Sequence, residues 1–175
     1  ELSNKEVKQN FEVNVFGLLN VIRHSAPYLR KQQSGHVFNI SSIGGFVANF
    51  PGFGVYCATK FAVAGLSESL AEELKSFQIN TTIIYPGYFR TDFLSGDSVK
   101  TPEFPIDEYK NARQVEQAHL NEINGNQPND PEKSAEVIIQ LSKEENPPVH
   151  FFMGEDAYSL AKEKIQSLQE ALDAF

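Results

Sequence analysis

The chain has 175 residues, of which 41% are hydrophobic and 22% are charged, values typical of a single globular domain. Its net charge of −8 argues against binding to nucleic acid or to an anionic membrane surface, because both require clustered Lys and Arg. No apolar run is long enough to span a bilayer, and the single cysteine, Cys57, allows no internal disulfide, so a reducing, cytoplasmic setting is expected.

Hydrophobic periodicity predicts helices and strands in alternation along the chain. A long helix is expected over 3–32, where Val7, Phe11 and Val15 begin an apolar stripe and Pro27 should strain or bend the last turns. The elements expected after it are a strand over 36–41, a helix over 55–77, a strand over 79–85, helices over 105–124 and 131–145, a strand over 149–153 and a helix over 155–173. This order implies an α/β domain of residues 1–175, built on a parallel sheet with covered faces.

A tyrosine and a lysine lie four residues apart near the start of the second long helix, as Tyr56 and Lys60. Residues at this spacing are neighbours on one face of a helix. The ammonium of Lys60 is therefore expected to favour the phenolate and to lower the pKa of Tyr56 from its ordinary value of about 10. Tyr56 would then suit general acid/base catalysis. The alternative is a half-buried tyrosine beside a surface lysine, with no chemical role.

Other polar residues stand at the ends of the predicted strands or inside an apolar helix. Ser41 and Ser42 end the first strand, and either could bind a substrate oxygen or cap the strand end. Thr91 comes shortly after the second strand and could bind a ligand or cap a helix before Asp92. Asn14 lies in an apolar helical segment, where it could act in catalysis or be a core amide satisfied by helix backbone.

Together these motifs resemble the short-chain dehydrogenase/reductase family. The family signature is a serine after a strand, followed by Y-x-x-x-K, and here Ser42 precedes Tyr56 by fourteen residues, one more than the commonest spacing. Asn14 in Asn-Val-Phe-Gly matches the family's helix asparagine, and residues 86–91 match its P-G-x-x-x-T segment. The resemblance covers residues 1 to about 95 and continues more loosely through 147–154, which looks like the family's last strand.

The resemblance implies a Rossmann-like, doubly wound parallel sheet and an NAD(P)-dependent oxidoreductase that interconverts an alcohol and a ketone or aldehyde. Tyr56 would be the general acid/base and Ser42, rather than Ser41, would bind the substrate oxygen beside it. Lys60 would hydrogen-bond the nicotinamide ribose, and Asn14 would hold a water that relays protons to Lys60. The residues expected to bind NAD or NADP are Tyr56, Lys60, Pro86, Gly87, Phe89 and Thr91.

One departure from the family pattern concerns the cofactor. Family members begin with a turn of the form T-G-x-x-x-G-x-G, which cradles the pyrophosphate at a helix N-terminus, and this chain contains no such motif. We therefore expect the C-terminal part of a longer enzyme, without the N-terminal strands and without the residue that chooses between NAD and NADP.

The same resemblance assigns the irregular stretch 92–130 to a substrate lid and pairs the two long helices across a homodimer. Phenylalanines gather in sequence around the predicted site and indicate an apolar alcohol or carbonyl substrate, although core packing explains some of them equally well. They are Phe46, Phe50, Phe53, Phe89, Phe93 and Phe104.

Two other functions stay open on the sequence alone. The chain could be a catalytically silent binding or regulatory module, which the missing glycine-rich turn favours and the complete set of catalytic residue types disfavours. Ser42 could instead be the nucleophile of a hydrolase, although it lacks a G-x-S-x-G elbow. The four histidines are scattered without metal-ligand spacing, so no metal is expected.

Overall fold

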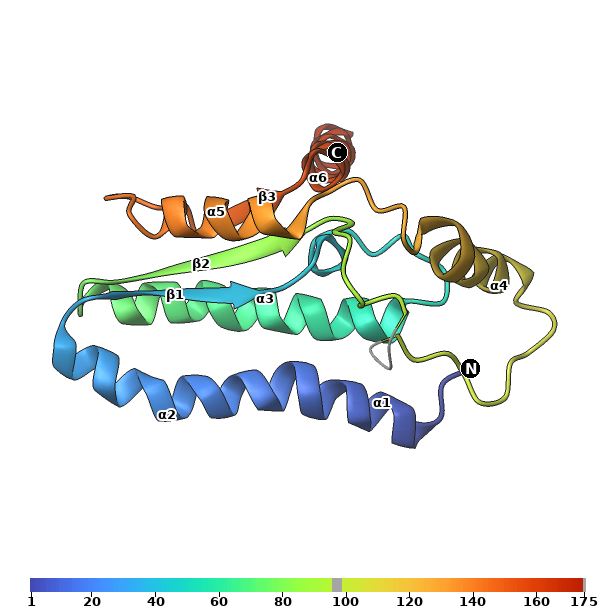
Figure 1. The fold of residues 1–175 in the computed structure, drawn as a ribbon, viewed down its shortest axis with the longest axis horizontal. Coiled ribbons are helices and arrows are strands. Elements are labelled where there is room, and N and C mark those ends of the chain that lie inside the picture. The colour runs from blue at the N-terminus through green and yellow to red at the C-terminus, as the bar shows by residue number, and fades with distance from the viewer. Residues whose placement is uncertain (96–98, 175) are drawn as a thin grey trace.

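The computed structural model describes residues 1–95 and 99–174 (Figure 1). Three strands pair in parallel in the order β1-β2-β3, with β1 over Gly35–Ile40, β2 over Ile79–Pro86 and β3 over His150–Met153. The register places Gly35 opposite Ile79. The predicted α/β architecture with a parallel sheet is confirmed, and every predicted strand is found within one or two residues of its expected bounds.

The long helix predicted over 3–32 comprises α1 (Asn4–Phe11), a π-helical turn η1 (Glu12–Phe16) and α2 (Gly17–Gln32). Its start is fixed by a capping box, in which the Ser3 hydroxyl accepts from the Glu6 N–H and the Glu6 carboxylate accepts from the Ser3 N–H. Pro27 lies inside α2, yet the helix continues to Gln32. The π-helical turn, which contains Asn14, was not predicted.

The remaining helices correct two of the sequence predictions. The helix expected from residue 105 begins at Lys110, because residues 106–109 form a turn in which the Tyr109 N–H donates to the Ile106 carbonyl oxygen at 3.1 Å. The helix expected to reach residue 145 ends at Leu141, ahead of acidic residues that a helix C-terminus disfavours. The elements are η2 (Ile43–Gly45, a 3₁₀ turn), α3 (Gly54–Lys75), α4 (Lys110–Gln117), η3 (Ala118–Ile123, a π-helical turn), α5 (Pro131–Leu141) and α6 (Glu155–Asp173).

The sheet lies between two layers of helix, with α1, α2 and α3 on one face and α5 on the other (Figure 1). Side chains of β2 alternate between these layers. Ile83 and Tyr85 pack with Ala64 of α3, whereas Ile84 packs with Leu141 of α5. The carboxyl ends of β1 and β2 therefore emerge together between the layers, at the edge where open α/β sheets bind ligands.

The turn after β1 approaches the backbone of α3 so closely that Gly45 has no room for a side chain. A Cβ there would lie 2.7 Å from the Lys60 carbonyl oxygen and would overlap the Ser41 hydroxyl. We expect Gly45→Ala to lower the free energy of unfolding by about 1–3 kcal/mol in urea denaturation, because neither neighbour can yield cheaply. Gly65→Ala is the matched control, since its Cβ would meet nothing within 4 Å and should stabilise α3 by about 0.5–1 kcal/mol. Equal stability of the two variants would contradict the close approach.

Candidate active site

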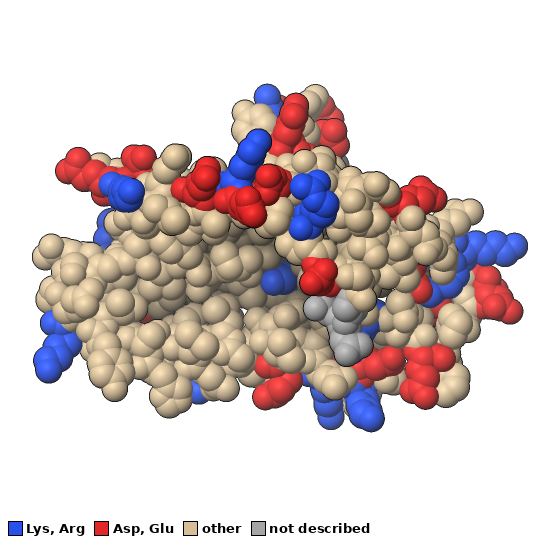
Figure 2. Space-filling view, in the orientation of Figure 1, with Lys and Arg blue, Asp and Glu red and all other residues tan. Residues whose placement is uncertain are grey.

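A cavity of about 390 Å³ opens at the carboxyl ends of β1 and β2. The face of the molecule in Figure 2 is hollowed between the helical layers, and uncharged residues dominate the walls of the hollow. Seven of the eight residues predicted for the site line this cavity, although they come from segments far apart in the sequence. They are Ser42, Tyr56, Lys60, Pro86, Gly87, Phe89 and Thr91.

Tyr56 lies in the first turn of α3, and its ring centroid is 5.7 Å from that of Phe93. Burial raises the pKa of Tyr56 to about 12, while a hydrogen bond with the Ser42 side chain acts in the opposite direction. At neutral pH the phenol is therefore protonated and able to donate its proton.

Lys60 lies one turn further along α3, with its Nζ 5.8 Å from the centroid of the Tyr56 ring. The ammonium donates a hydrogen bond to the Ile40 carbonyl oxygen at 3.2 Å, and burial lowers the pKa of Lys60. The predicted lowering of the Tyr56 pKa by Lys60 is therefore wrong for this structure. The charge lies over the ring rather than at the hydroxyl, and loss of hydration outweighs its attraction for the phenolate.

The two serines after β1 have different surroundings. The Ser41 hydroxyl is buried and donates to the Lys60 carbonyl oxygen at 2.9 Å, which fastens the end of β1 to α3. The Ser42 hydroxyl is half-buried, accepts from the Gly44 N–H at 3.0 Å and interacts with the Tyr56 phenol. Ser42 is therefore the serine whose hydroxyl lies beside Tyr56, whereas Ser41 has a packing role.

Asn14 does not line the cavity. Its Nδ2 donates to Thr59 Oγ1 at 3.0 Å, and Thr59 Oγ1 donates to the Tyr56 carbonyl oxygen at 2.7 Å. Thr59 is completely buried, so this chain of bonds ties the π-helical turn to the turn of α3 that carries Tyr56. The Asn14 Nδ2 group therefore bonds to a neighbouring helix rather than to its own helix backbone.

The segment after β2 supplies one wall of the cavity. The Thr91 N–H donates to the Phe89 carbonyl oxygen at 2.9 Å, and Thr91 Oγ1 accepts from the Phe93 N–H at 3.4 Å. Thr91 therefore closes a turn rather than capping a helix. Phe89 pairs as an isolated parallel bridge with Asn129, which joins this segment to the far end of the stretch 92–130.

Sequence reasoning missed polar residues from the stretch 92–130 and its neighbours. Tyr88 Oη donates to His119 Nε2 at 2.8 Å, and His119 Nδ1–H donates to the Val115 carbonyl oxygen at 2.7 Å, so His119 is buried with both nitrogens occupied. Gln127 is buried in the same cavity wall. Only the fold brings His119 and Gln127 to the site, because neither belongs to a recognisable motif, and Tyr88 occupies a variable position of the segment 86–91. Residues 96–98 of the predicted lid lie outside the described residues.

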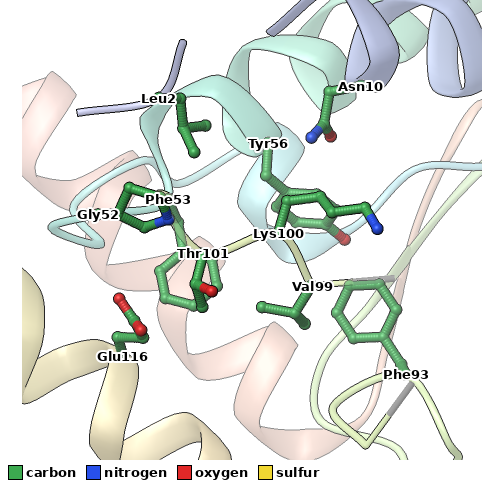
Figure 3. Close-up of a pocket in the computed structure, with 11 residues that line it drawn as sticks. Leu2, Asn10, Gly52, Phe53, Tyr56, Phe93, Val99, Lys100, Thr101 and Glu116 are labelled. Carbon is green, nitrogen blue, oxygen red and sulfur yellow. The ribbon is translucent and has the colours of Figure 1, made fainter. Parts of the chain in front are cut away.

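A second, smaller cavity of about 30 Å³ adjoins Tyr56. Figure 3 shows Tyr56 with Phe53, Val99 and Lys100, which line this cavity together. The space accommodates no more than one or two waters. Residues 99–102 thus share this small cavity with the start of α3, where Tyr56 lies.

The described residues can also be inspected for a metal site and for a serine–histidine pair. Within residues 1–95 and 99–174, no three His, Cys, Asp or Glu side chains group in a way that could hold a metal ion. No hydrogen bond joins Ser42 to a histidine in the same ranges, and His119 is engaged by Tyr88 and Val115.

Among the described helices, none is both long enough and apolar enough to cross a membrane.

Comparison with known proteins agrees with this fold. Residues 1–100 match the family model described as short chain dehydrogenase. The chain is 35% identical over 150 residues to the oxidoreductase BOA17 of Botryotinia fuckeliana, covering 86% of this chain and 54% of the relative. It is 34% identical over 154 residues to 3-ketodihydrosphingosine reductase of Bacteroides thetaiotaomicron, covering 87% of this chain and 56% of the relative. The chain thus spans about half the length of the curated relatives it matches.

Solved structures give the same result. A short-chain dehydrogenase from Streptomyces avermitilis superimposes with a TM-score of 0.85 at 33% identity, over 99% of this chain and 61% of that one. Two other short-chain dehydrogenases share the fold at lower identity. One from Burkholderia phymatum, in complex with NAD, superimposes with a TM-score of 0.75 at 19% identity, over 95% of this chain and 60% of that one. One from Burkholderia cenocepacia, in complex with NADP, superimposes with a TM-score of 0.63 at 23% identity, over 98% of this chain and 59% of that one. The chain belongs to the short-chain dehydrogenase family and has its Rossmann-like fold.

Proposed function

We propose that this chain carries the catalytic residues of an NAD(P)-dependent oxidoreductase that interconverts an alcohol and a ketone or aldehyde. The observation that supports it most directly is that Ser42, Tyr56 and Lys60 line one cavity, although Ser42 follows β1 and the other two lie on α3. When bound, the nicotinamide supplies or accepts the hydride. The residues of this chain orient the reactants and move the proton.

Tyr56 would donate its phenolic proton to the carbonyl oxygen in reduction and take it back in oxidation. Ser42, beside the same phenol, would donate a hydrogen bond to the substrate oxygen and stabilise the charge that develops there. Asn14 would act through Thr59, whose bond to the Tyr56 carbonyl oxygen holds the first turn of α3, and would hold a water leading to Lys60.

The donor set of the cavity suits a nicotinamide nucleotide. Lys60 carries three N–H donors and gives one to Ile40, which leaves two directions for ribose hydroxyl groups. Ile84, Pro86 and Met153 provide an apolar wall against which a planar ring can lie. The backbone around Phe89 and the hydroxyl of Thr91 would hold the carboxamide, with Gly87 in the same loop.

The substrate and assembly proposals rest on the surfaces around this site. Phe50, Phe53 and Phe93 line the cavity and favour an apolar alcohol or carbonyl substrate, with 92–130 as its lid. Exposed apolar side chains follow the two long helices, which we propose pair in a cytoplasmic homodimer. They are Val13, Phe16, Val21, Tyr28 and Phe61.

The test is a titration of the full natural protein with NADH and with NADPH, in which nicotinamide fluorescence reports binding. Saturable binding of either nucleotide is expected, and the tighter one identifies the working cofactor. Turnover of an apolar ketone with that cofactor should follow. No binding of either nucleotide would refute the proposal and favour a silent binding or regulatory module.

A further inference from the structure

The loop that follows β2 carries three of the residues proposed to touch the cofactor, so whatever fixes this loop helps to fix the cofactor. Gly87, Phe89 and Thr91 belong to no helix or strand. A loop of this kind needs partners for its backbone N–H and C=O groups outside regular structure. Those partners come from α6 and from the end of the stretch 92–130, neither of which supplies a proposed catalytic residue.

Asp156, in the first turn of α6, provides the first of these partners. Its Oδ2 accepts from the Tyr88 N–H at 2.6 Å, across 68 positions of sequence. The neighbouring Gly87 N–H donates to the Met153 carbonyl oxygen at 2.9 Å, just before α6 begins. Figure 1 shows α6 beginning where the strands end. The carboxylate thus extends the pairing of β2 with β3 by one further bond.

Asn129, at the end of the stretch 92–130, provides the second. Its Nδ2 donates both to Asp156 Oδ1 at 2.8 Å and to the Tyr88 carbonyl oxygen at 2.9 Å. Its backbone adds two more bonds, since the Arg90 N–H donates to the Asn129 carbonyl oxygen and the Asn129 N–H to the Tyr88 carbonyl oxygen. The cofactor loop, the proposed lid and α6 therefore meet at one carboxylate.

The surrounding backbone leaves space for this carboxylate and for little else. A Cβ at Gly87 would overlap the Asp156 carboxylate. A Cβ at Gly154 would lie 2.6 Å from Asp156 Oδ1 and 2.7 Å from Asn129 Nδ2, and Gly154 also has a φ of +101°, which disfavours other residues. Both glycines therefore permit the close approach of Asp156 to the loop.

We propose that Asp156 is a positioning residue that sets the affinity for the nicotinamide cofactor, by holding the Gly87–Tyr88 turn against the cavity and linking it to the lid through Asn129. This inference rests on the proposed function. Asp156 touches neither substrate nor cofactor and takes no part in the transfer of hydride or proton.

The test compares Asp156→Ala with Glu155→Gln in the full protein. Glu155 also lies in the first turn of α6, so the control removes a charge at the same end of the same helix dipole without a bond to the loop. Loss of charge-assisted hydrogen bonds predicts a cofactor Kd raised about tenfold or more in Asp156→Ala. The control should leave the Kd unchanged, and kcat at saturating cofactor should stay near that of the unmutated protein. Asp156→Asn keeps one acceptor oxygen, so its cofactor Kd should lie between those of the unmutated protein and Asp156→Ala.

Amide hydrogen exchange at Tyr88 separates positioning from general stability. Asp156→Ala should speed exchange at this amide, with little change in the β2 core. A lower melting temperature with an unchanged cofactor Kd for the folded protein would overturn the inference, because it would show a structural role alone. If the unmutated protein binds neither nucleotide, the proposed function fails and this inference fails with it; if it binds and Asp156→Ala binds equally well, only the inference fails.

Discussion

Tyr56→Phe should lower kcat for carbonyl reduction about a thousandfold while the cofactor still binds, because general acid catalysis by a positioned side chain contributes about 10²–10⁴-fold. The substitution removes only the hydroxyl, so the ring can keep its packing against Phe93, whose centroid is 5.7 Å away. Stability should therefore change little. The measurement is single-turnover reduction of an apolar ketone, with cofactor affinity taken from nicotinamide fluorescence.

Tyr28→Phe is the matched control, since Tyr28 is 77% exposed on α2, away from the cavity. It removes the same atom from a tyrosine with no proposed part in catalysis or cofactor binding, and it should leave kcat and cofactor affinity as they are. Full turnover by Tyr56→Phe would refute the assignment of Tyr56 as the proton donor. Loss of cofactor binding in that variant would instead show that the phenol has a larger part in holding the nucleotide than in moving a proton.

The strands and long helices could be predicted because local pattern determines them. An apolar stripe at helical spacing and a short apolar run before Gly or Pro each report one element, and both long helices were found nearly to the residue. Tyr56 and Lys60 of the Y-x-x-x-K motif also line one cavity at the strand ends, although their roles stay predictions. Its electrostatics could not be predicted, because the pKa of Tyr56 depends on how many neighbours remove water from the phenol, which spacing on one helix does not reveal.

The polar partners of the cofactor loop show the other limit. Asp156 and Asn129 meet Tyr88 across 68 and 41 positions of sequence, and neither lies in a motif with recognised spacing. Two glycines are the local sign of this cluster: Gly87 lies directly before Tyr88 and Gly154 lies two residues before Asp156, and a side chain would not fit at either position. A glycine in the sequence indicates a position where a side chain could be excluded, whereas only the fold shows that the Asp156 carboxylate occupies the space beside Gly87 and Gly154.

The pH dependence of the two reaction directions tests the corrected electrostatics of the site. Reduction takes up one proton, so the ratio of the reduction rate to the oxidation rate must fall tenfold for each unit of pH. The pKa of Tyr56 decides which of the two rates carries this change. With that pKa at about 12, the phenol is protonated throughout the range from neutral to pH 10. Reduction should then be independent of pH, whereas oxidation, which needs the phenolate as base, should rise tenfold per unit.

Initial rates measured in both directions between about pH 7 and 9 should therefore show a hundredfold rise in oxidation and a flat profile for reduction, provided that Tyr56 titrates far above this range. The opposite pattern, with oxidation level and reduction falling as pH rises, would mean that the pKa of Tyr56 lies near or below neutrality in the working enzyme. Lys60, whose Nζ lies 5.8 Å from the ring centroid in this structure, would then have to move closer to the hydroxyl during turnover. Lys60→Met distinguishes the two cases. If the pKa of Tyr56 already lies far above the measured range, the variant should keep the tenfold rise in oxidation rate per unit of pH. If Lys60 lowers that pKa in the working enzyme, the variant should gain this rise.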